Sequence, residues 1–168
     1  MNIETPRLWI TRLTADMAQA VHLNSLDEDN RRFVPDEVFE TLEEAQETVA
    51  FLITAYEGAD GPFVYPVIRK SDKANIGYVQ ACCVEEGFEV GYHIAADYTG
   101  RGYATEALSA FVPECLRKLV ADQIWGVVLE ENIASQRVLE KSGFQLVFQG
   151  EAPYQGERRL IRKYLYHA

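Results

Sequence analysis

Three strand-like runs in the middle of the sequence constrain its fold more than any other feature. Residues 63–69, 76–84 and 88–95 are rich in β-branched and aromatic side chains and are separated by short turns. Short turns join antiparallel neighbours, so these runs predict a β-meander. In the third run, alternation places Glu89 and His93 on one face of the strand.

Two helices are expected before this meander. Thr14 can cap a helix that runs to about Ser25. Thr41 and Glu44 have the spacing of a capping box and precede apolar residues at helical spacing. The polar, proline-containing segment 27–36 between the two helices predicts a loop.

The rest of the chain alternates between strands and helices. An apolar helix is expected to begin near Gly102, and Pro113 inside it should kink or shorten it. The nearly continuous apolar run 124–129 predicts a strand that is buried on both faces. The remaining expected elements are a first strand over 7–13, a helix over 132–142 that ends at Gly143, and final strands over 144–149 and 160–166.

This order predicts an α/β (α+β) fold. A meander followed by strand–helix–strand implies a central mixed, mostly antiparallel twisted sheet of about six to seven strands with helices on both faces. The length of 168 residues suits a single domain over 1–168.

Composition limits the classes of function. A formal net charge of −10 disfavours a nucleic-acid partner. No apolar run is long enough to cross a bilayer and the first residues do not resemble a signal peptide, so a cytoplasmic protein is expected. The three histidines are far apart in sequence and no Cys/His cluster has zinc-like spacing, so no metal site is expected. At least two of Cys82, Cys83 and Cys115 are expected to be buried apolar side chains.

A Gly-X-Gly turn between a strand and a helix carries the most chemical information. Gly100 and Gly102 leave backbone N–H groups unpaired at the start of a helix, where a phosphate or diphosphate binds well. The alternative is an ordinary loop whose glycines serve turn geometry. A P-loop would require a nearby lysine, and a dinucleotide fingerprint would require glycine at Thr105, so both are excluded.

The turn and several later motifs together resemble the GNAT family of acetyltransferases, in particular the branch of ribosomal-protein N-terminal (alanine/serine) acetyltransferases. The motifs that carry this resemblance are Thr99-Gly100-Arg101-Gly102-Tyr103-Ala104-Thr105-Glu106-Ala107, Asn132-Ile133-Ala134-Ser135, Glu140-Lys141-Ser142-Gly143-Phe144, Glu4-Thr5-Pro6-Arg7-Leu8 and Gly91-Tyr92. The resemblance covers nearly the whole chain, and it is the combination of motifs, in this order and spacing, that is specific.

The resemblance implies that acetyl-coenzyme A is the cosubstrate. Backbone amides of the turn would hold the diphosphate, and the pantetheine arm would lie along residues 94–96, where two parallel strands splay apart. Asn132 would contact the pantetheine amide or act only as a helix N-cap, and Ser135 would donate to the sulfur or be only a solvated polar residue. The implied coenzyme-binding residues are Ile94, Ala95, Ala96, Thr99, Gly100, Arg101, Gly102, Tyr103, Ala104, Thr105, Asn132 and Ser135.

Two features depart from the family pattern. Thr99 stands where the turn usually begins with Arg or Gln, and Leu139 stands where many members have a tyrosine that protonates the leaving sulfur. A thiol with a pKa of about 8.5 leaves readily as an anion, so Ser135 or an ordered water can replace the tyrosine.

The implied reaction is direct attack of a primary amine on the thioester. Ser135, Glu89 and His93 are the candidate catalytic residues, with Glu89 and His93 either acting as bases or serving as a surface carboxylate and a structural histidine. An α-amine, with a pKa of about 7.7–8.0, needs less help from a base than a lysine-like amine near 10.4.

The acceptor is expected to be a peptide N-terminus or a small amine, bound by a monomer or a homodimer. It would enter between segments 27–36 and 152–158, where Asp27, Glu28, Asp29, Asp36 and Glu37 either steer a cation or solvate a loop. A catalytically silent acyl-coenzyme A binding or sensing module is the alternative function.

Overall fold

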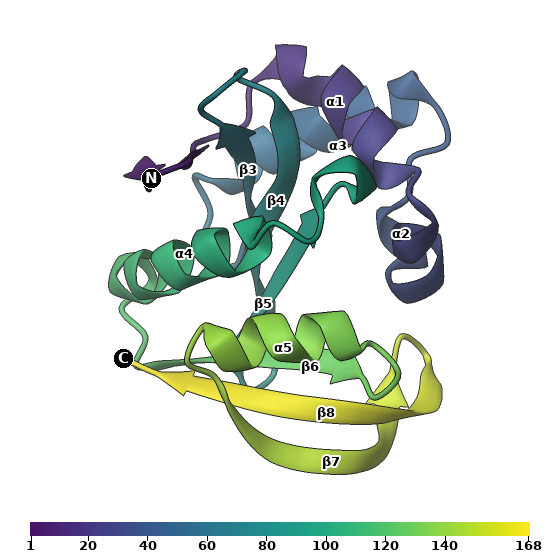
Figure 1. Cartoon of the computed structure of the whole chain (residues 1–168), viewed down its shortest axis with the longest axis vertical. Helices are drawn as coiled ribbons and strands as arrows, with labels where there is room; N and C mark the ends of the chain where they lie inside the picture. Colours follow the sequence, from purple (N-terminus) through teal and green to yellow (C-terminus); the bar gives the residue numbers. More distant parts are fainter.

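One mixed sheet of eight strands organises the chain, in the order β1-β2-β3-β4-β5-β6-β8-β7. The computed structural model describes all 168 residues (Figure 1). The predicted meander is confirmed: β3 (Phe63–Arg69), β4 (Asn75–Val84) and β5 (Gly87–Ile94) pair antiparallel. The predicted fold class is confirmed as well, with slightly more strands than expected.

The extra strand lies at the N-terminus. β1 (Ile3–Glu4) pairs antiparallel with β2 (Leu8–Ile10), which is shorter than the strand predicted over 7–13. A strand of two residues is too short for the alternation of apolar and polar side chains to reveal it.

The first two predicted helices are present with changed boundaries. A 3-10 turn (Ala15–Met17) leads into α1 (Ala18–Ser25), and Thr14 makes no side-chain capping bond. The capping box before α3 (Leu42–Ala55) is confirmed, because Thr41 accepts from the Glu44 N–H and the Glu44 carboxylate accepts from the Thr41 N–H.

The loop predicted over 27–36 is wrong. It contains α2 (Glu28–Phe33) and a 3-10 turn (Pro35–Glu37). Acidic residues in the first turn of α2 and arginines in its last turn suit the helix dipole. With six residues, α2 is too short to show an apolar period, so the sequence pattern favoured a loop.

The helix α4 (Tyr103–Leu119) continues past Pro113, so the expected shortening is wrong. Pro113 removes a hydrogen bond to the carbonyl of Ser109, and both residues lie on the exposed side of α4. Water can therefore satisfy that carbonyl. Figure 1 shows α4 on the near side of β3 and β4, with α3 on the far side.

The C-terminal part follows the prediction with longer final strands. β6 (Gln123–Leu129) precedes α5 (Ile133–Lys141), and Gly143 has a positive φ of 91° at the helix end. β7 (Gln145–Tyr154) and β8 (Glu157–His167) form a long hairpin whose turn contains only Gln155 and Gly156. The segment predicted as a polar hairpin loop is therefore mostly extended.

The parallel strands β5 and β6 diverge. They share a single pair in register, Glu89 opposite Trp125, whereas β4 and β5 pair along their whole length. Beyond Glu89 the two strands separate toward the end of β5. This opening is the splay that the family resemblance implied.

A core of 25 buried residues lies between the sheet and its helices, with Tyr65, Phe111 and Tyr164 among its largest side chains. The prediction for the cysteines is wrong, because only Cys115 is buried, Cys82 is half-buried and Cys83 is exposed. Cys83 lies near the end of β4, where the sheet is open to solvent. No helix is both long and apolar enough to span a membrane. No group of three or more His, Cys, Asp or Glu side chains is arranged to hold a metal ion.

Candidate functional site

The turn before α4 presents a row of free backbone donors. Gly100 and Gly102 have φ values of +75° and +80°, a conformation that side chains with a Cβ rarely adopt. No side chain caps α4, and none of the N–H groups from 100 to 105 donates a hydrogen bond within the chain. The positive end of the helix dipole lies at the same point. The turn therefore has the chemistry of an anion site.

The N-terminal segment braces this turn. The Arg7 Nε donates to Glu106 Oε2 over 2.6 Å, and the Arg7 Nη1 donates to the Arg101 carbonyl over 2.9 Å. The Arg7 guanidinium also lies 4.3 Å from the centre of the Tyr103 ring. Burial alone would raise the pKa of Glu106, but hydrogen bonds from Thr5 and Arg7 outweigh it and lower the pKa. Glu106 thus serves the geometry of the turn, and the Thr5–Arg7 motif has a structural role there.

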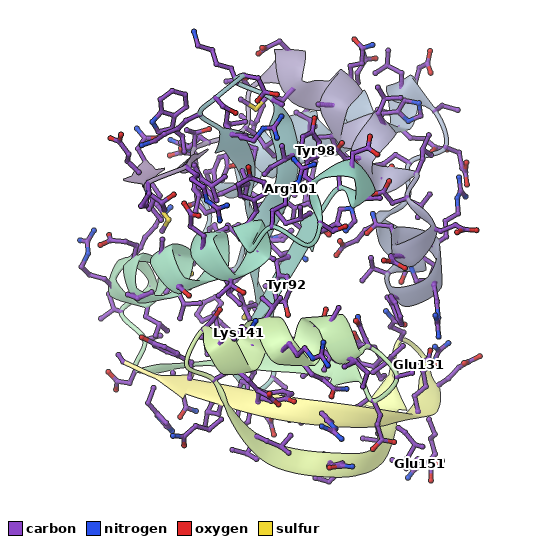
Figure 2. All side chains as sticks on the ribbon, viewed as in Figure 1. Tyr92, Tyr98, Arg101, Glu131, Lys141 and Glu151 are labelled. Atoms are coloured by element: carbon purple, nitrogen blue, oxygen red, sulfur yellow. The ribbon has the colours of Figure 1, made fainter.

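A cavity of about 650 Å³ extends from this turn to α2 and the β7–β8 hairpin. Most of the predicted coenzyme and catalytic residues line it, whereas Ala95, Ala96 and Arg101 do not. Figure 2 shows Tyr98 and Arg101 near the start of α4, and Tyr92 between α4 and α5. The predicted residues that line the cavity are Glu89, His93, Ile94, Thr99, Gly100, Gly102, Tyr103, Ala104, Thr105, Asn132 and Ser135.

The start of α5 is fixed beside β5. The Asn132 Oδ1 accepts from the Ser135 N–H over 3.2 Å, so Asn132 is the N-cap and its amide NH₂ makes no bond within the chain. The Tyr92 hydroxyl donates to the Ser135 carbonyl over 2.9 Å. The Ser135 hydroxyl has no hydrogen-bond partner within the chain, and Ser135 lines the cavity. Sequence analysis named Tyr92 only as part of the Gly91-Tyr92 motif and did not predict this contact, which joins β5 to α5 across the splay.

Leu139, in place of the family's tyrosine, has a packing role. It is completely buried, and a Cβ on Gly126 would lie only 2.7 Å from its Cδ2. The leucine fills the space above the glycine of β6. Core packing therefore favours leucine over a tyrosine at this position.

Glu89 is a half-buried carboxyl on β5 that lines the cavity. Burial raises its pKa to about 7, although Lys163 opposes the shift. No hydrogen bond or ion pair within the chain involves its side chain. A carboxyl with a pKa near neutrality and free oxygens can accept a proton at physiological pH.

His93 is tied to the element before α2. Its Nε2 lies 3.1 Å from the Asp27 Oδ2, which also accepts from the Ala96 N–H over 2.8 Å. Burial lowers the pKa of His93, and the neighbouring Asp27 opposes this. His93 and Asp27 therefore link β5 to α2, and this contact occupies one ring nitrogen.

Glu37 is a second cavity carboxylate. The Tyr78 hydroxyl donates to its Oε2, and the Gln80 Nε2 donates to its Oε1 over 3.0 Å. Burial raises the pKa of Glu37, while the bond from Gln80 opposes the shift. In the sequence, Glu37 belongs to an acidic segment. Tyr78 and Gln80 are two residues apart and therefore share one face of β4, and this spacing was the only signal for them.

The far end of the cavity lies between α2 and the β7–β8 turn. The Gln155 side chain donates to the Phe33 carbonyl over 2.6 Å, and an ion pair of 3.0 Å joins Arg32 to Glu131. Burial raises the pKa of Tyr154, which lines the cavity here, to about 12. Segments 27–36 and 152–158, which were expected to flank the acceptor, thus meet at the same end.

Comparisons with known proteins agree with this geometry. Residues 7–145 match the family model described as an acetyltransferase (GNAT) domain. The uncharacterized N-acetyltransferase YnaD of Bacillus subtilis (strain 168) is 27% identical over 147 residues, which are 86% of this chain and 83% of YnaD. A GNAT-family acetyltransferase from Bacillus anthracis superposes with a TM-score of 0.84 at 24% identity, covering 99% of this chain and 98% of that one. RimL, a ribosomal L7/L12 alpha-N-protein acetyltransferase in complex with coenzyme A, has a TM-score of 0.82 at 17% identity, covering 99% and 98% of the two chains.

Proposed function

The chain belongs to the GNAT family of acetyltransferases, and from this we propose that it transfers the acetyl group of acetyl-coenzyme A to the α-amine of a peptide or to a small primary amine. One observation carries the proposal. A single cavity joins the free amides of the turn before α4 to Glu89, a carboxyl whose pKa is raised to about 7. Anion binding and proton acceptance are thus available in one continuous space.

The residues of the turn fit the coenzyme. The amides of residues 100–105 would hold its diphosphate, since they have no other acceptor and no Cβ at Gly100 or Gly102 blocks an anion. The pantetheine arm would lie in the opening where β5 and β6 diverge, with the free amide of Asn132 beside it. When bound, acetyl-coenzyme A supplies the thioester carbonyl that the amine attacks.

Glu89 is the proposed base. At pH 7 about half of the Glu89 side chains are ionised, and about one-tenth of an α-amine with a pKa near 8 is already neutral. Proton transfer from the attacking nitrogen to Glu89 therefore needs little additional driving force. His93 is the weaker candidate, because Asp27 occupies its Nε2.

Ser135 is the proposed donor to the leaving sulfur. Its hydroxyl has no partner within the chain, and its backbone is fixed on both sides by Asn132 and Tyr92. A hydrogen bond stabilises a departing thiolate sufficiently, since a thiol with a pKa of about 8.5 does not require full protonation. The reaction can thus proceed with Leu139 in place of a tyrosine.

A peptide N-terminus is the acceptor that the relatives favour. RimL is a ribosomal-protein alpha-N-acetyltransferase with the same fold, and the cavity here extends from the turn before α4 to α2 and the β7–β8 turn. The proposal therefore places the acceptor amine beside Glu89, with the rest of the acceptor leaving past Tyr154.

Thiol release from acetyl-coenzyme A tests the proposal. Wild-type protein should release thiol in the presence of N-terminal peptides or small amines, and Glu89→Gln should reduce kcat by about 10²-fold. Glu85→Gln is the matched control, because Glu85 is an exposed carboxyl in the β4–β5 turn. Coenzyme binding with no release for any acceptor would instead indicate a silent binding or sensing module.

A further inference from the structure

Two carboxylates in the cavity have no cationic partner. The chain forms eleven ion pairs, yet neither Glu37 nor Glu89 takes part in any of them. Both side chains are half-buried and both line the cavity. Removing an ionised carboxyl from water is costly unless a cation or hydrogen bonds compensate. Glu37 receives hydrogen bonds from two neutral donors and Glu89 receives none, so a cationic ligand would stabilise both carboxylates.

The two carboxylates come from different elements, Glu89 from β5 and Glu37 from the 3-10 turn over Pro35–Glu37. The Gln80 side chain lies across Gly91, since a Cβ at Gly91 would be 2.6 Å from the Gln80 Nε2. The same nitrogen donates to Glu37, which places the Glu37 carboxylate close to Gly91. Glu89 lies two residues before Gly91 on the same face of β5.

The hydrogen bonds at Glu37 hold it in place without neutralising it. Tyr78 and Gln80 each donate one bond, and both are uncharged donors. These bonds therefore fix the orientation of the carboxylate without supplying the positive charge that a cation would bring. Supporting hydrogen bonds of this kind hold a binding side chain in the geometry that a ligand requires.

The side-chain oxygen of Asn30, which also lines the cavity, has no hydrogen-bond partner. Asn30 is only 1% exposed and lines the same cavity, yet its Oδ1 accepts no hydrogen bond. Its amide nitrogen is held by the Ser25 carbonyl over 3.3 Å. An orphaned amide oxygen in a folded protein calls for a donor, and an N–H of a bound acceptor would supply one.

We propose that the acceptor carries two nitrogen cations, the amine that is acetylated beside Glu89 and a second one that binds Glu37. The inference rests on the acetyl transfer proposed above and names its substrate class. A peptide whose first residues include arginine or lysine has this chemistry, and so does a small diamine.

The balance of charge during the reaction requires two separate roles. The ammonium group first loses one proton to solvent and becomes a neutral amine. Its nitrogen lone pair then forms the bond to the thioester carbon as the carbon–sulfur bond breaks, the thiolate leaves, and Glu89 takes the second proton from the nitrogen. Glu89 is then neutral and the acetylated nitrogen carries no charge. Glu37 keeps its negative charge throughout, so the second cation stays bound while the first is consumed.

Matched acceptors test this inference. We expect kcat/KM to be at least about tenfold higher for a peptide beginning with arginine than for its neutral citrulline analogue, and for 1,4-diaminobutane than for butylamine. Glu37→Gln should remove both preferences, so that kcat/KM becomes equal for the two peptides and equal for the two amines. Asp36→Asn, which removes an adjacent exposed carboxylate, should leave both preferences intact. The peptide pair and the amine pair distinguish the two kinds of acceptor.

Several outcomes would overturn it. The first is a wild-type protein whose kcat/KM is equal for the two peptides and equal for the two amines. The second is a Glu37→Gln variant that loses activity equally with all four acceptors while its KM for acetyl-coenzyme A is unchanged. If Glu37→Gln fails to fold, Gln80→Ala, which frees the Glu37 carboxylate, should weaken the same preference. Absence of turnover with every acceptor would overturn the proposed reaction instead. Calorimetric titration with the same pairs would then decide the inference, with tighter binding of each dication supporting it and equal binding refuting it.

Discussion

Replacing Glu89 with glutamine should make the protein more stable at pH 8 and less active. Burial raises the pKa of this carboxyl from 4.5 to about 7, so the folded state resists its ionisation. This shift in pKa corresponds to a loss of at most about 3 kcal/mol in the free energy of unfolding when the carboxyl is ionised. Because the side chain is only half-buried, screening by water reduces the expected gain to about 1–2 kcal/mol.

The pH window follows from the sign of the shift. Below pH 4.5 the carboxyl is protonated in both the folded and the unfolded chain, so glutamine and glutamic acid should be equivalent there. As pH rises from 4.5 to 7, the unfolded chain ionises first and the wild type loses stability. Above pH 7 the difference between the two proteins should be constant.

Urea denaturation of the coenzyme-free protein at pH 4.5, 6 and 8 measures this effect. The free energy of unfolding of Glu89→Gln should exceed that of the wild type increasingly with pH, whereas Glu85→Gln should follow the wild type throughout. A Glu89→Gln variant that is less stable at pH 8, or whose difference does not change with pH, would refute the assignment of a raised pKa to this residue.

Three further substitutions separate coenzyme binding from chemistry. Arg7→Met removes the brace on the turn and should raise KM for acetyl-coenzyme A about tenfold, but not KM for S-acetylpantetheine, which lacks the diphosphate; an equal rise for both would contradict that role. Gly102→Val should abolish coenzyme binding in calorimetry, because φ is +80° and a branched side chain would enter the anion site; retained affinity would show that the turn is not the site. Ser135→Ala should lower kcat about three- to tenfold at unchanged coenzyme affinity, and an unchanged rate would leave Ser135 with a structural role only.

The sequence predicted the parts of the fold that rest on local patterns. The meander follows from alternating side chains between short turns, and the capping box before α3 from the spacing of Thr41 and Glu44. The elements that were missed are short ones. β1 has two residues and α2 has six, so neither contains enough positions for a period to emerge.

The residues proposed to bind the coenzyme could be predicted from sequence because most of them lie on one contiguous segment with its glycines. The acceptor end could not, because its groups come from separate elements and meet only in the folded chain. Glu37 approaches Gln80 across 43 positions and His93 approaches Asp27 across 66. No local pattern encodes those contacts.

The amides of residues 100–105 test the central claim most directly. In ¹⁵N-labelled protein titrated with coenzyme A, these amide protons should show the largest downfield shifts, because each N–H gains a charged acceptor that it lacks in the free chain. Saturation of the protein with these resonances unmoved, and with the main changes elsewhere, would contradict the account.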